Sequence, residues 1–320
     1  MLFRSMGGSG ALRITIGDLL DHQARRFGDR EALVHVERGV RYTYAQFRDE
    51  CNLMARGLMA IGIEKGDHVG IWATNYPEWV VAQFATAKIG AVLVTVNPAY
   101  RSHELEYVLR QSDARALMLI SSFRSSDYVA MLNEVAPELH DSAPGRLQCA
   151  RLPQLEHVIF IPPEAGVSGR GYPPGMWRWA EIKARSKEVT AAALAVRQAE
   201  CDPDDVINIQ YTSGTTGNPK GAMLTHYNIV ANASYFGDGL RLTEHDRLCI
   251  QFPFYHCGGC VIGTLCCVTK GATMVIPAEY FDPLKSLVAV EQERCTALTG
   301  VPTMFIAELG HPDFEKFDLS

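Results

Sequence analysis

Short apolar runs alternate with longer helix-like segments along the chain from about residue 67. The first half of this pattern reads HVGIWATN, PEWVVAQFATAKIG, AVLVTVNP, SHELEYVLRQS and ARALMLI. The short runs are continuously apolar, which is typical of strands that helices cover on both faces. The alternation predicts βαβ units, and the predicted fold class is therefore α/β, with doubly wound, mostly parallel sheets and flanking helices.

The alternation starts again after residue 205. It predicts strands at VINIQYTSG, RLCIQFP, ATMVIPA and ALTGVP, and helices at HYNIVANASYFG and DPLKSLVAVEQER. Before it lie a Pro- and Gly-rich loop, 162–175, and an alanine-rich helix, TAAALAVRQAE. We expect residues 1–10 to be a tail and 11–320 to be one folded unit with a subdomain seam near 200–205.

Turn and capping residues mark the ends of several of these elements. The segment EALVHVERGVRYTYAQF predicts a hairpin, with its turn at residues 37–40, that leads into a helix. Asn75 just before Pro77, and Ser102 just before Glu104, are typical of helix N-termini. No repeat of 20 to 50 residues is visible, which excludes a solenoid.

Composition and charge narrow the class of protein. The 320 residues are 47% hydrophobic and 21% charged, which is ordinary for a globular protein that is long enough for a large core. Thirty Lys and Arg residues against 36 Asp and Glu residues give a formal net charge of −6. Because there is no basic arm or stripe, we expect no nucleic acid among the partners.

The nine cysteines are scattered and odd in number, which indicates a reducing compartment rather than a disulfide framework. The N-terminus has no apolar run of signal-peptide length, and Gln, Pro, His and Gly residues interrupt the longest charge-free stretch, 248–269. We therefore expect no membrane span and a cytoplasmic location. The mitochondrial matrix is the alternative, because the first 15 residues hold two arginines. The oligomeric state is unknown from the sequence.

The segment YTSGTTGNPKG follows the predicted strand 206–210 directly. Loops at the carboxyl ends of parallel strands are where α/β folds bind ligands. Glycines let backbone N–H groups approach an anion, hydroxyls donate hydrogen bonds, and Lys220 supplies a positive charge. The segment therefore predicts a polyphosphate site. Its candidate residues are Thr212, Ser213, Gly214, Thr215, Thr216, Gly217, Asn218, Pro219, Lys220 and Gly221.

This segment is not the P-loop of GTPases and ATPases, because Lys220 lies between Pro219 and Gly221. A flexible linker is disfavoured, since a linker has no reason to follow a buried strand. The string TSGTTGNPKG instead resembles the phosphate loop of the adenylate-forming, or AMP-binding, superfamily. That resemblance implies that Thr212 to Thr216 and Lys220 contact the phosphates of ATP. It also implies that Lys220 is catalytic and that the Thr212 hydroxyl lies near bound Mg²⁺.

Two further segments carry the same resemblance. In PFYHCGG, the place of His256 lies in the family beside the carboxylate of the acyl substrate, which makes His256 a catalytic and substrate-binding candidate. In ALTGVPTMF, family members line the acyl or nucleotide pocket with the Gly-Val-Pro-Thr turn. This turn adds three substrate-binding candidates: Gly300, Val301 and Pro302. The segments VNPAYR and DREALV look like the fatty-acyl branch, that of the acyl-CoA synthetases.

The resemblance implies an ATP-dependent ligase that converts a small-molecule carboxylic acid to an acyl-adenylate and then to acyl-CoA. A medium- or long-chain fatty acid would be the substrate, and ATP, Mg²⁺ and coenzyme A the cofactors. An aryl-CoA ligase remains an alternative, because tertiary packing shapes the acyl pocket.

The sequence also departs from the family pattern. It has no Gly-Tyr-Gly-x-Thr-Glu segment, no Thr-Gly-Asp segment and no counterpart of the C-terminal lid domain. Residues 11–320 would then be part of the large N-terminal AMP-binding domain, and we expect residues 1–320 alone to be inactive. A nucleotide-binding fragment or interaction module without turnover is therefore a second alternative.

Cys257 and Cys260 form a C-x-x-C pair. A zinc site would need four ligands at defined spacing, and a thioredoxin-like site would lie near an N-terminal βαβ unit. Cysteine that packs as a small hydrophobic residue is the default interpretation of this pair.

Overall fold

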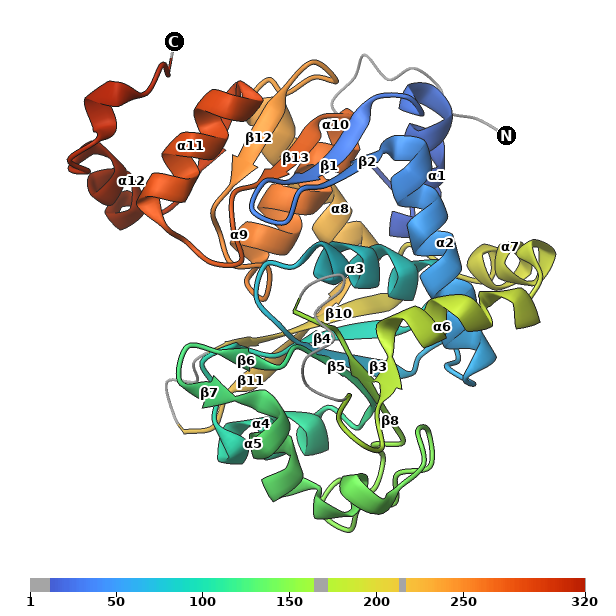
Figure 1. Cartoon of the computed structure of the whole chain (residues 1–320). Coiled ribbons are helices and arrows are strands. Elements are labelled where there is room, and N and C mark those ends of the chain that lie inside the picture. Colours follow the sequence, from blue (N-terminus) through green and yellow to red (C-terminus); the bar gives the residue numbers. More distant parts are fainter. Residues whose placement is uncertain (1–11, 164–171, 213–216, 320) are drawn as a thin grey trace.

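Two mostly parallel sheets with helices around them form the part of the chain that the structure describes, residues 12–163, 172–212 and 217–319. The computed structural model in Figure 1 shows one sheet above the other, with helix α3 between them. The continuous apolar runs form the strands, because helices bury both of their faces. The predicted α/β class with flanking helices is confirmed.

The larger sheet has seven strands in the order β11-β10-β4-β3-β5-β8-β9. Strand β11 lies antiparallel to β10 at one edge, and the other neighbours are parallel. The strands of this sheet are β3 (His68–Trp72), β4 (Val92–Thr95), β5 (Ala114–Leu119), β8 (His157–Phe160), β9 (Trp177–Arg178), β10 (Val206–Thr212) and β11 (Lys220–Thr225).

The smaller sheet has five strands in the order β14-β12-β13-β1-β2. The predicted N-terminal hairpin is confirmed, and its first strand pairs with β13, with Leu33 opposite Met274. The strands are β1 (Glu31–His35), β2 (Val40–Thr43), β12 (Arg247–Ile250), β13 (Thr273–Ile276) and β14 (Ala297–Thr299). A separate two-stranded ribbon joins β6 (Ser122–Phe123) to β7 (Ser126–Asp127).

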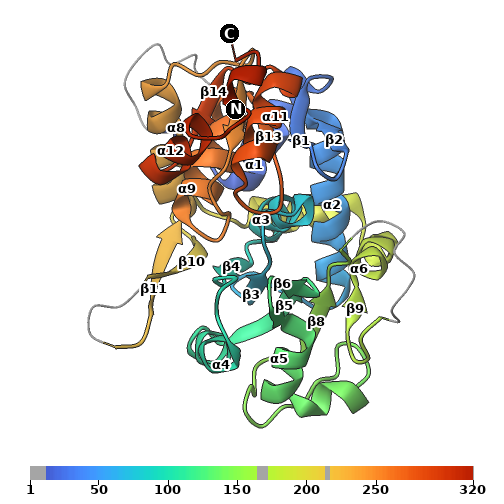
Figure 2. The same cartoon turned by 60° about the vertical axis from the view of Figure 1, so that its left-hand side comes forward.

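The helices lie between the sheets and on their outer faces. Helices α4 and α5 pack together beyond the larger sheet, and α11 packs over β12 and β13 on the far side of the smaller one (Figures 1 and 2). The α-helices are α1 (Ile16–Phe27), α2 (Tyr44–Ala60), α3 (Pro77–Ile89), α4 (Ser102–Gln111), α5 (Tyr128–Val135), α6 (Trp179–Arg185), α7 (Ala191–Ala199), α8 (His226–Gly239), α9 (Cys257–Gly259), α10 (Cys266–Lys270), α11 (Pro283–Glu293) and α12 (Pro302–Leu309). A π-helical segment, η3 (Cys260–Leu265), joins α9 to α10, and 3₁₀ turns are η1 (Pro137–Asp141), η2 (Ser186–Glu188) and η4 (Phe314–Lys316).

The chain contributes strands to the smaller sheet twice. It first forms β1 and β2 near the N-terminus, and after β11 and α8 it forms β12, β13 and β14. Residues 200–205, where the sequence predicts a seam, lie between α7 and β10, a strand of the larger sheet. Strand β10 belongs to that sheet because residues 208–210 pair with residues 93–95 of β4. The two sheets are therefore not formed by two successive halves of the chain.

Helix α3 is buried on almost every side, and within it only Glu78 is not buried. An all-round apolar helix is stable only in the interior of a protein. Its two buried long polar side chains are hydrogen-bonded. The Lys88 ammonium donates to a carboxylate oxygen of Asp21 at 2.6 Å, and the Gln83 amide donates to the backbone oxygen of Cys260 at 2.8 Å.

Asn75 does not cap α3, contrary to the sequence prediction, because Tyr76 occupies the N-cap position without a side-chain hydrogen bond. The Asn75 side chain instead bridges to the loop after β12. Its amide donates to the Phe252 oxygen at 2.9 Å, and its oxygen accepts from the Phe254 N–H at 2.8 Å. Asn75, which the sequence predicted to cap a helix, therefore connects the loop after β3 of the larger sheet to the loop after β12 of the smaller one.

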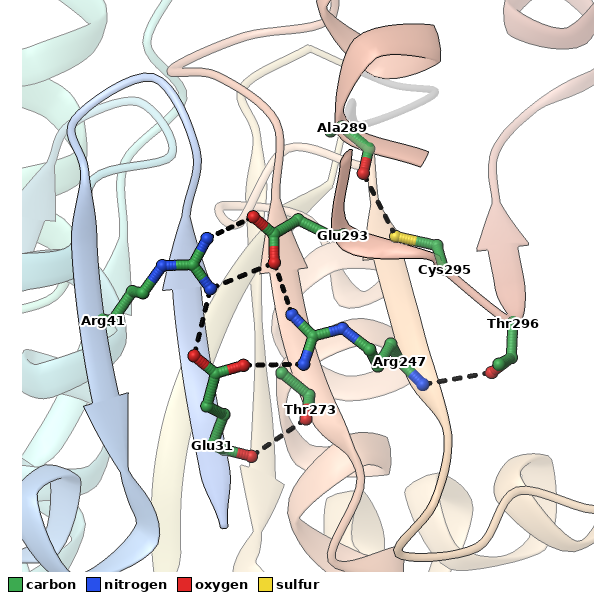
Figure 3. Close-up of polar contacts among 8 residues, drawn as sticks. All are labelled: Glu31, Arg41, Arg247, Thr273, Ala289, Glu293, Cys295 and Thr296. Atoms are coloured by element: carbon green, nitrogen blue, oxygen red, sulfur yellow. Dashed lines mark hydrogen bonds and ion pairs between the residues drawn. The ribbon is translucent and has the colours of Figure 1, made fainter. Parts of the chain in front are cut away.

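Four charged side chains connect β1, β2, β12 and α11 at one end of the smaller sheet, as Figure 3 shows. The Glu293 carboxylate, whose side chain is 7% exposed, accepts from the guanidinium groups of Arg41 and Arg247. Glu31 accepts from the same two groups at 3.0 and 2.7 Å. The cluster therefore holds the end of α11 against three strands.

We expect Glu293→Gln to lower the free energy of unfolding by about 1–3 kcal/mol, because two guanidinium groups lose a charged acceptor. The half-exposed position of Arg41 keeps the loss below that of a fully buried pair. Urea unfolding of both proteins measures the difference. Glu188→Gln is the control, since its surface pair with Arg185 should contribute no more than about 0.5 kcal/mol. Equal losses in the two variants would contradict this role of Glu293.

His226 and His35 are fully buried histidines, and burial lowers the pKa of each to about 4. His226 Nδ1 accepts from the Ile16 N–H at 3.1 Å, and His35 Nε2 lies 2.9 Å from the backbone oxygen of Asn75. Each histidine is therefore held neutral in the folded protein, whereas in the unfolded chain it takes up a proton below about pH 6.5.

Because the unfolded chain binds protons that the folded protein does not, stability is complete above about pH 6.5 and falls as the pH drops towards 4. We expect about 2–3 kcal/mol of this loss to come from His226. In His226→Asn the free energy of unfolding should be lower at pH 7 and change less between pH 6.5 and 4. His245→Asn, at an exposed position, is the control. A variant slope equal to that of the unchanged protein would show that His226 does not cause the loss.

Candidate functional site

The predicted phosphate segment is the end of a β-hairpin. Strands β10 and β11 pair antiparallel, and their last pair places Thr212 opposite Lys220. Strand β11 was not predicted, since the sequence indicated a loop that stops at Pro-Lys-Gly. Side chains of directly opposite residues lie on the same face of an antiparallel pair. The exposed hydroxyl of Thr212 and the exposed side chain of Lys220 therefore lie on the same face.

Helix α4 holds both ends of this hairpin loop. The Tyr107 hydroxyl donates to the Pro219 oxygen at 3.1 Å, and the Tyr211 hydroxyl donates to the Gln111 side chain. Burial raises the pKa of Tyr211 to about 12, so its hydroxyl keeps the proton that it donates. The loop is thus anchored at the two points where it leaves the strands.

Not all residues predicted for the loop lie in the part of the chain that the structure describes. Ser213, Gly214, Thr215 and Thr216 lie outside it. Gly217 and Asn218 are exposed, and Pro219 and Gly221 are partly buried. Gly217 has φ of 126°, which only glycine adopts readily.

His256 follows β12 and lies at the start of helix α9, with its side chain exposed. Its Nδ1 accepts a hydrogen bond from the Gly258 N–H at 3.0 Å and lies 3.6 Å from the Cys257 sulfur. The backbone just before it is held by Asn75 through Phe252 and Phe254. The imidazole ring therefore projects from an anchored loop at the carboxyl end of a strand.

The third predicted segment follows β14. Gly300 is partly buried directly after the strand, Val301 is the N-cap of α12, and Pro302 is its first residue. Strand β14 is parallel to β12, with Thr299 opposite Ile250. The predicted turn and the loop that carries His256 therefore leave the smaller sheet at the same edge.

A cavity of about 230 Å³ lies where the carboxyl ends of both sheets meet. Loops after β3 and β4 line it from the larger sheet, and loops after β12 and β13 line it from the smaller one. Among its lining residues are Asn75, Asn97, Gln251, Tyr255, Tyr280 and Met304. Tyr255 precedes His256 and Met304 lies on α12, so the cavity adjoins two of the three predicted segments.

The phosphate hairpin is linked to the loop of His256 by a contact that the sequence did not predict. The Gln210 amide, two residues before Thr212, donates to the Cys260 sulfur at 3.0 Å. Gln210 and Cys260 are both buried and lie 50 positions apart. Three sequence segments gave a signal for residues around the cavity: VNPAYR holds Asn97, PFYHCGG holds Tyr255 and ALTGVPTMF holds Met304. The sequence gave no signal for Gln210 or Gln251.

Among residues 12–163, 172–212 and 217–319, no three His, Cys, Asp or Glu side chains lie together in a group that could hold a metal ion. The same part of the chain contains no helix that is both long and apolar enough to span a membrane.

The family model described as "AMP-binding enzyme" matches residues 20–320. The chain belongs to this family. The parallel sheets and the strand-to-loop position of the Thr212–Gly221 segment agree with the predicted resemblance to AMP-binding enzymes, which is confirmed.

Relatives of this AMP-binding chain are acyl-CoA synthetases or ligases by name. YngI of Bacillus subtilis (strain 168), whose name describes an acyl-CoA synthetase, is 52% identical over 306 residues, which cover 96% of this chain and 54% of YngI. "Medium-chain acyl-CoA ligase ACSF2, mitochondrial" of Mus musculus is 41% identical over 316 residues, 98% of this chain and 50% of the relative. The chain thus spans about half the length of the curated relatives it matches.

A solved structure has the same fold. The inhibitor-bound N-terminal domain of FACL13 from Mycobacterium tuberculosis matches with a TM-score of 0.77 and 25% identity. The match covers 96% of this chain and 68% of that domain.

Proposed function

We propose that this AMP-binding chain serves in the ATP-dependent activation of a carboxylic acid, first to an acyl-adenylate and then to acyl-CoA. The observation that carries the proposal is the hairpin that places Thr212 opposite Lys220 at the carboxyl end of β10. The names of YngI and ACSF2 support the same class of reaction. In this reaction ATP supplies the adenylyl group and pyrophosphate leaves.

Lys220 is the residue that we assign to the phosphates. It begins β11, and the pairing of Thr212 with Lys220 holds its backbone in a defined register. An ammonium group on a fixed strand stabilises negative charge that develops on a leaving group without needing to reorganise. The loop residues from Thr212 to Gly221 would bind the rest of the polyphosphate through backbone N–H groups and hydroxyls.

Magnesium fits the Thr212 hydroxyl as a single protein ligand. Mg²⁺ prefers oxygen ligands and commonly keeps several waters while it binds substrate phosphates. The Thr212 hydroxyl lies 3.4 Å from the Lys220 oxygen, so its own oxygen remains available as an acceptor.

The acid would bind near His256, with Gly300, Val301 and Pro302 on the other side. This assignment is supported by the cavity beside Tyr255 and Met304, whose aromatic and apolar lining suits an acyl chain. A medium-chain fatty acid agrees with the name of ACSF2, and an aryl acid is the alternative. Coenzyme A would accept the acyl group from the adenylate. We propose a cytoplasmic location, with the mitochondrial matrix as the alternative that the name of ACSF2 supports.

We expect Lys220→Ala in the full-length protein to slow acid-dependent exchange of pyrophosphate into ATP by about 10²–10³, the equivalent of about 2–4 kcal/mol. The loss should fall on the rate rather than on the affinity for the acid, because the ammonium meets charge on the leaving pyrophosphate. Lys187→Ala, on η2 and outside the hairpin, is the matched control. A Lys220→Ala rate within threefold of the control would remove Lys220 from the mechanism.

We expect His256→Ala to raise the KM for the carboxylic acid by about 10–100-fold, because a hydrogen bond to a charged group contributes about 1.5–3 kcal/mol. The KM for ATP should change little. Steady-state kinetics with each substrate varied in turn measures both constants. Lys220→Ala is the comparison, because it should lower the rate and leave the affinity for the acid little changed. An effect confined to ATP would contradict the assignment of His256 to the acid.

A further inference from the structure

Cys257 and Cys260 differ in exposure although they lie on one helical segment. Cys257 begins α9 and is the one exposed cysteine of the nine, whereas Cys260 is 1% exposed. Residues three apart on a helix are neighbours, with Cβ atoms about 5–6 Å apart. An exposed thiol next to a buried one is the arrangement in which the first can react with a molecule in solution and the second can displace it.

Each thiol also contacts a different part of the candidate site. The Cys257 sulfur lies 3.6 Å from Nδ1 of His256, the residue that we assign to the acid. The Cys260 sulfur accepts from the Gln210 amide at 3.0 Å, on the strand that leads to Thr212. The pair therefore lies between the loop of His256 and the hairpin that carries Thr212 and Lys220.

The exposure of the two sulfurs defines their order in a reaction with a molecule in solution. The Cys257 sulfur is exposed and can be reached first, and it lies 3.6 Å from Nδ1 of His256. The thiolate is the reactive form of cysteine in such an exchange. Burial raises the pKa of Cys260 to about 12, so this second sulfur reacts only after Cys257, when its proton can pass to the departing external thiolate.

We propose that Cys257 and Cys260 are a reversible dithiol–disulfide pair that reacts with low-molecular-weight disulfides and changes the shape of the candidate site. The Cys257 sulfur attacks one sulfur of the external disulfide, and the external thiolate that leaves takes up the proton lost by Cys257. Cys260 then attacks the Cys257 sulfur, which forms the protein disulfide, and the second external thiolate leaves and takes up the proton lost by Cys260. Two protein thiols are oxidised and one disulfide is reduced to two thiols.

Closing this disulfide requires a movement. The two Cβ atoms must approach to about 3.5–4.5 Å, which tightens the turn and takes each sulfur away from its present partner. Gly259, inside that turn, packs so closely that a Cβ there would lie 2.4 Å from the Pro253 oxygen. Tightening of the turn therefore displaces the loop 253–256, which carries His256.

The test uses the reduced chain and oxidised glutathione without air, followed by peptide mass mapping. We expect the unchanged chain to form the 257–260 disulfide and to release two glutathiones for each disulfide formed. Cys260→Ser should stop at a stable glutathione adduct on Cys257, and Cys257→Ser should react at neither position. Cys295→Ser, a half-buried cysteine on another loop, is the control and should behave like the unchanged chain.

The proposal is overturned if the unchanged chain accumulates a stable adduct on Cys257, or if Cys257→Ser oxidises Cys260 as fast as the unchanged chain does. Amide hydrogen exchange tests the link to the site. Residues 252–260 should exchange differently in the oxidised and reduced chains, and identical exchange would overturn that link. Neither measurement needs ligase activity, so a failure of the proposed function would leave both results interpretable.

Discussion

Helix α3 imposes the main constraint on this fold, because it is buried between two sheets and offers no face to water. Its buried long polar side chains need partners inside the protein, since an unpaired buried group costs about 1–3 kcal/mol. Lys88 finds Asp21 on α1, and Gln83 finds the backbone of Cys260 beyond β12. Asn75, just before the helix, binds the loop after β12 in the same way. These contacts set how the two sheets lie around the helix.

The position of the candidate site follows from that arrangement. With α3 between them, the sheets bring the loops after β3 and β4 to the loops after β12 and β13, and the cavity lies among them. The contact of Gln210 with Cys260 joins the phosphate hairpin to the loop of His256 across the same boundary. The loop that we assign to the phosphates on one sheet and the loop that we assign to the acid on the other are thereby connected.

The stability of the smaller sheet and its use as a binding surface depend on opposite ends of its strands. The charge cluster around Glu293 closes the end near Arg247, where β12 begins. His256, Gly300 and the cavity lie at the other end, where the strands finish. In open α/β sheets ligands bind in the crevice outside the carboxyl ends of the parallel strands, where loops on a rigid scaffold carry the binding residues.

The sequence by itself determined the strands and helices that bury apolar faces, the parallel character of the sheets and the loop that carries Lys220. Those features depend on local periodicity and on residues close together in the chain. Strand β11, the bridging role of Asn75 and the partners of the two C-x-x-C thiols were decided only by the tertiary structure. Asn75 and the buried thiol depend on distant segments, the loop after β12 and Gln210, whereas β11 depends on the edge of β10 next to it in the chain. Local sequence does not encode which distant groups will lie within hydrogen-bonding distance, because the packing of α3 between the sheets sets those distances.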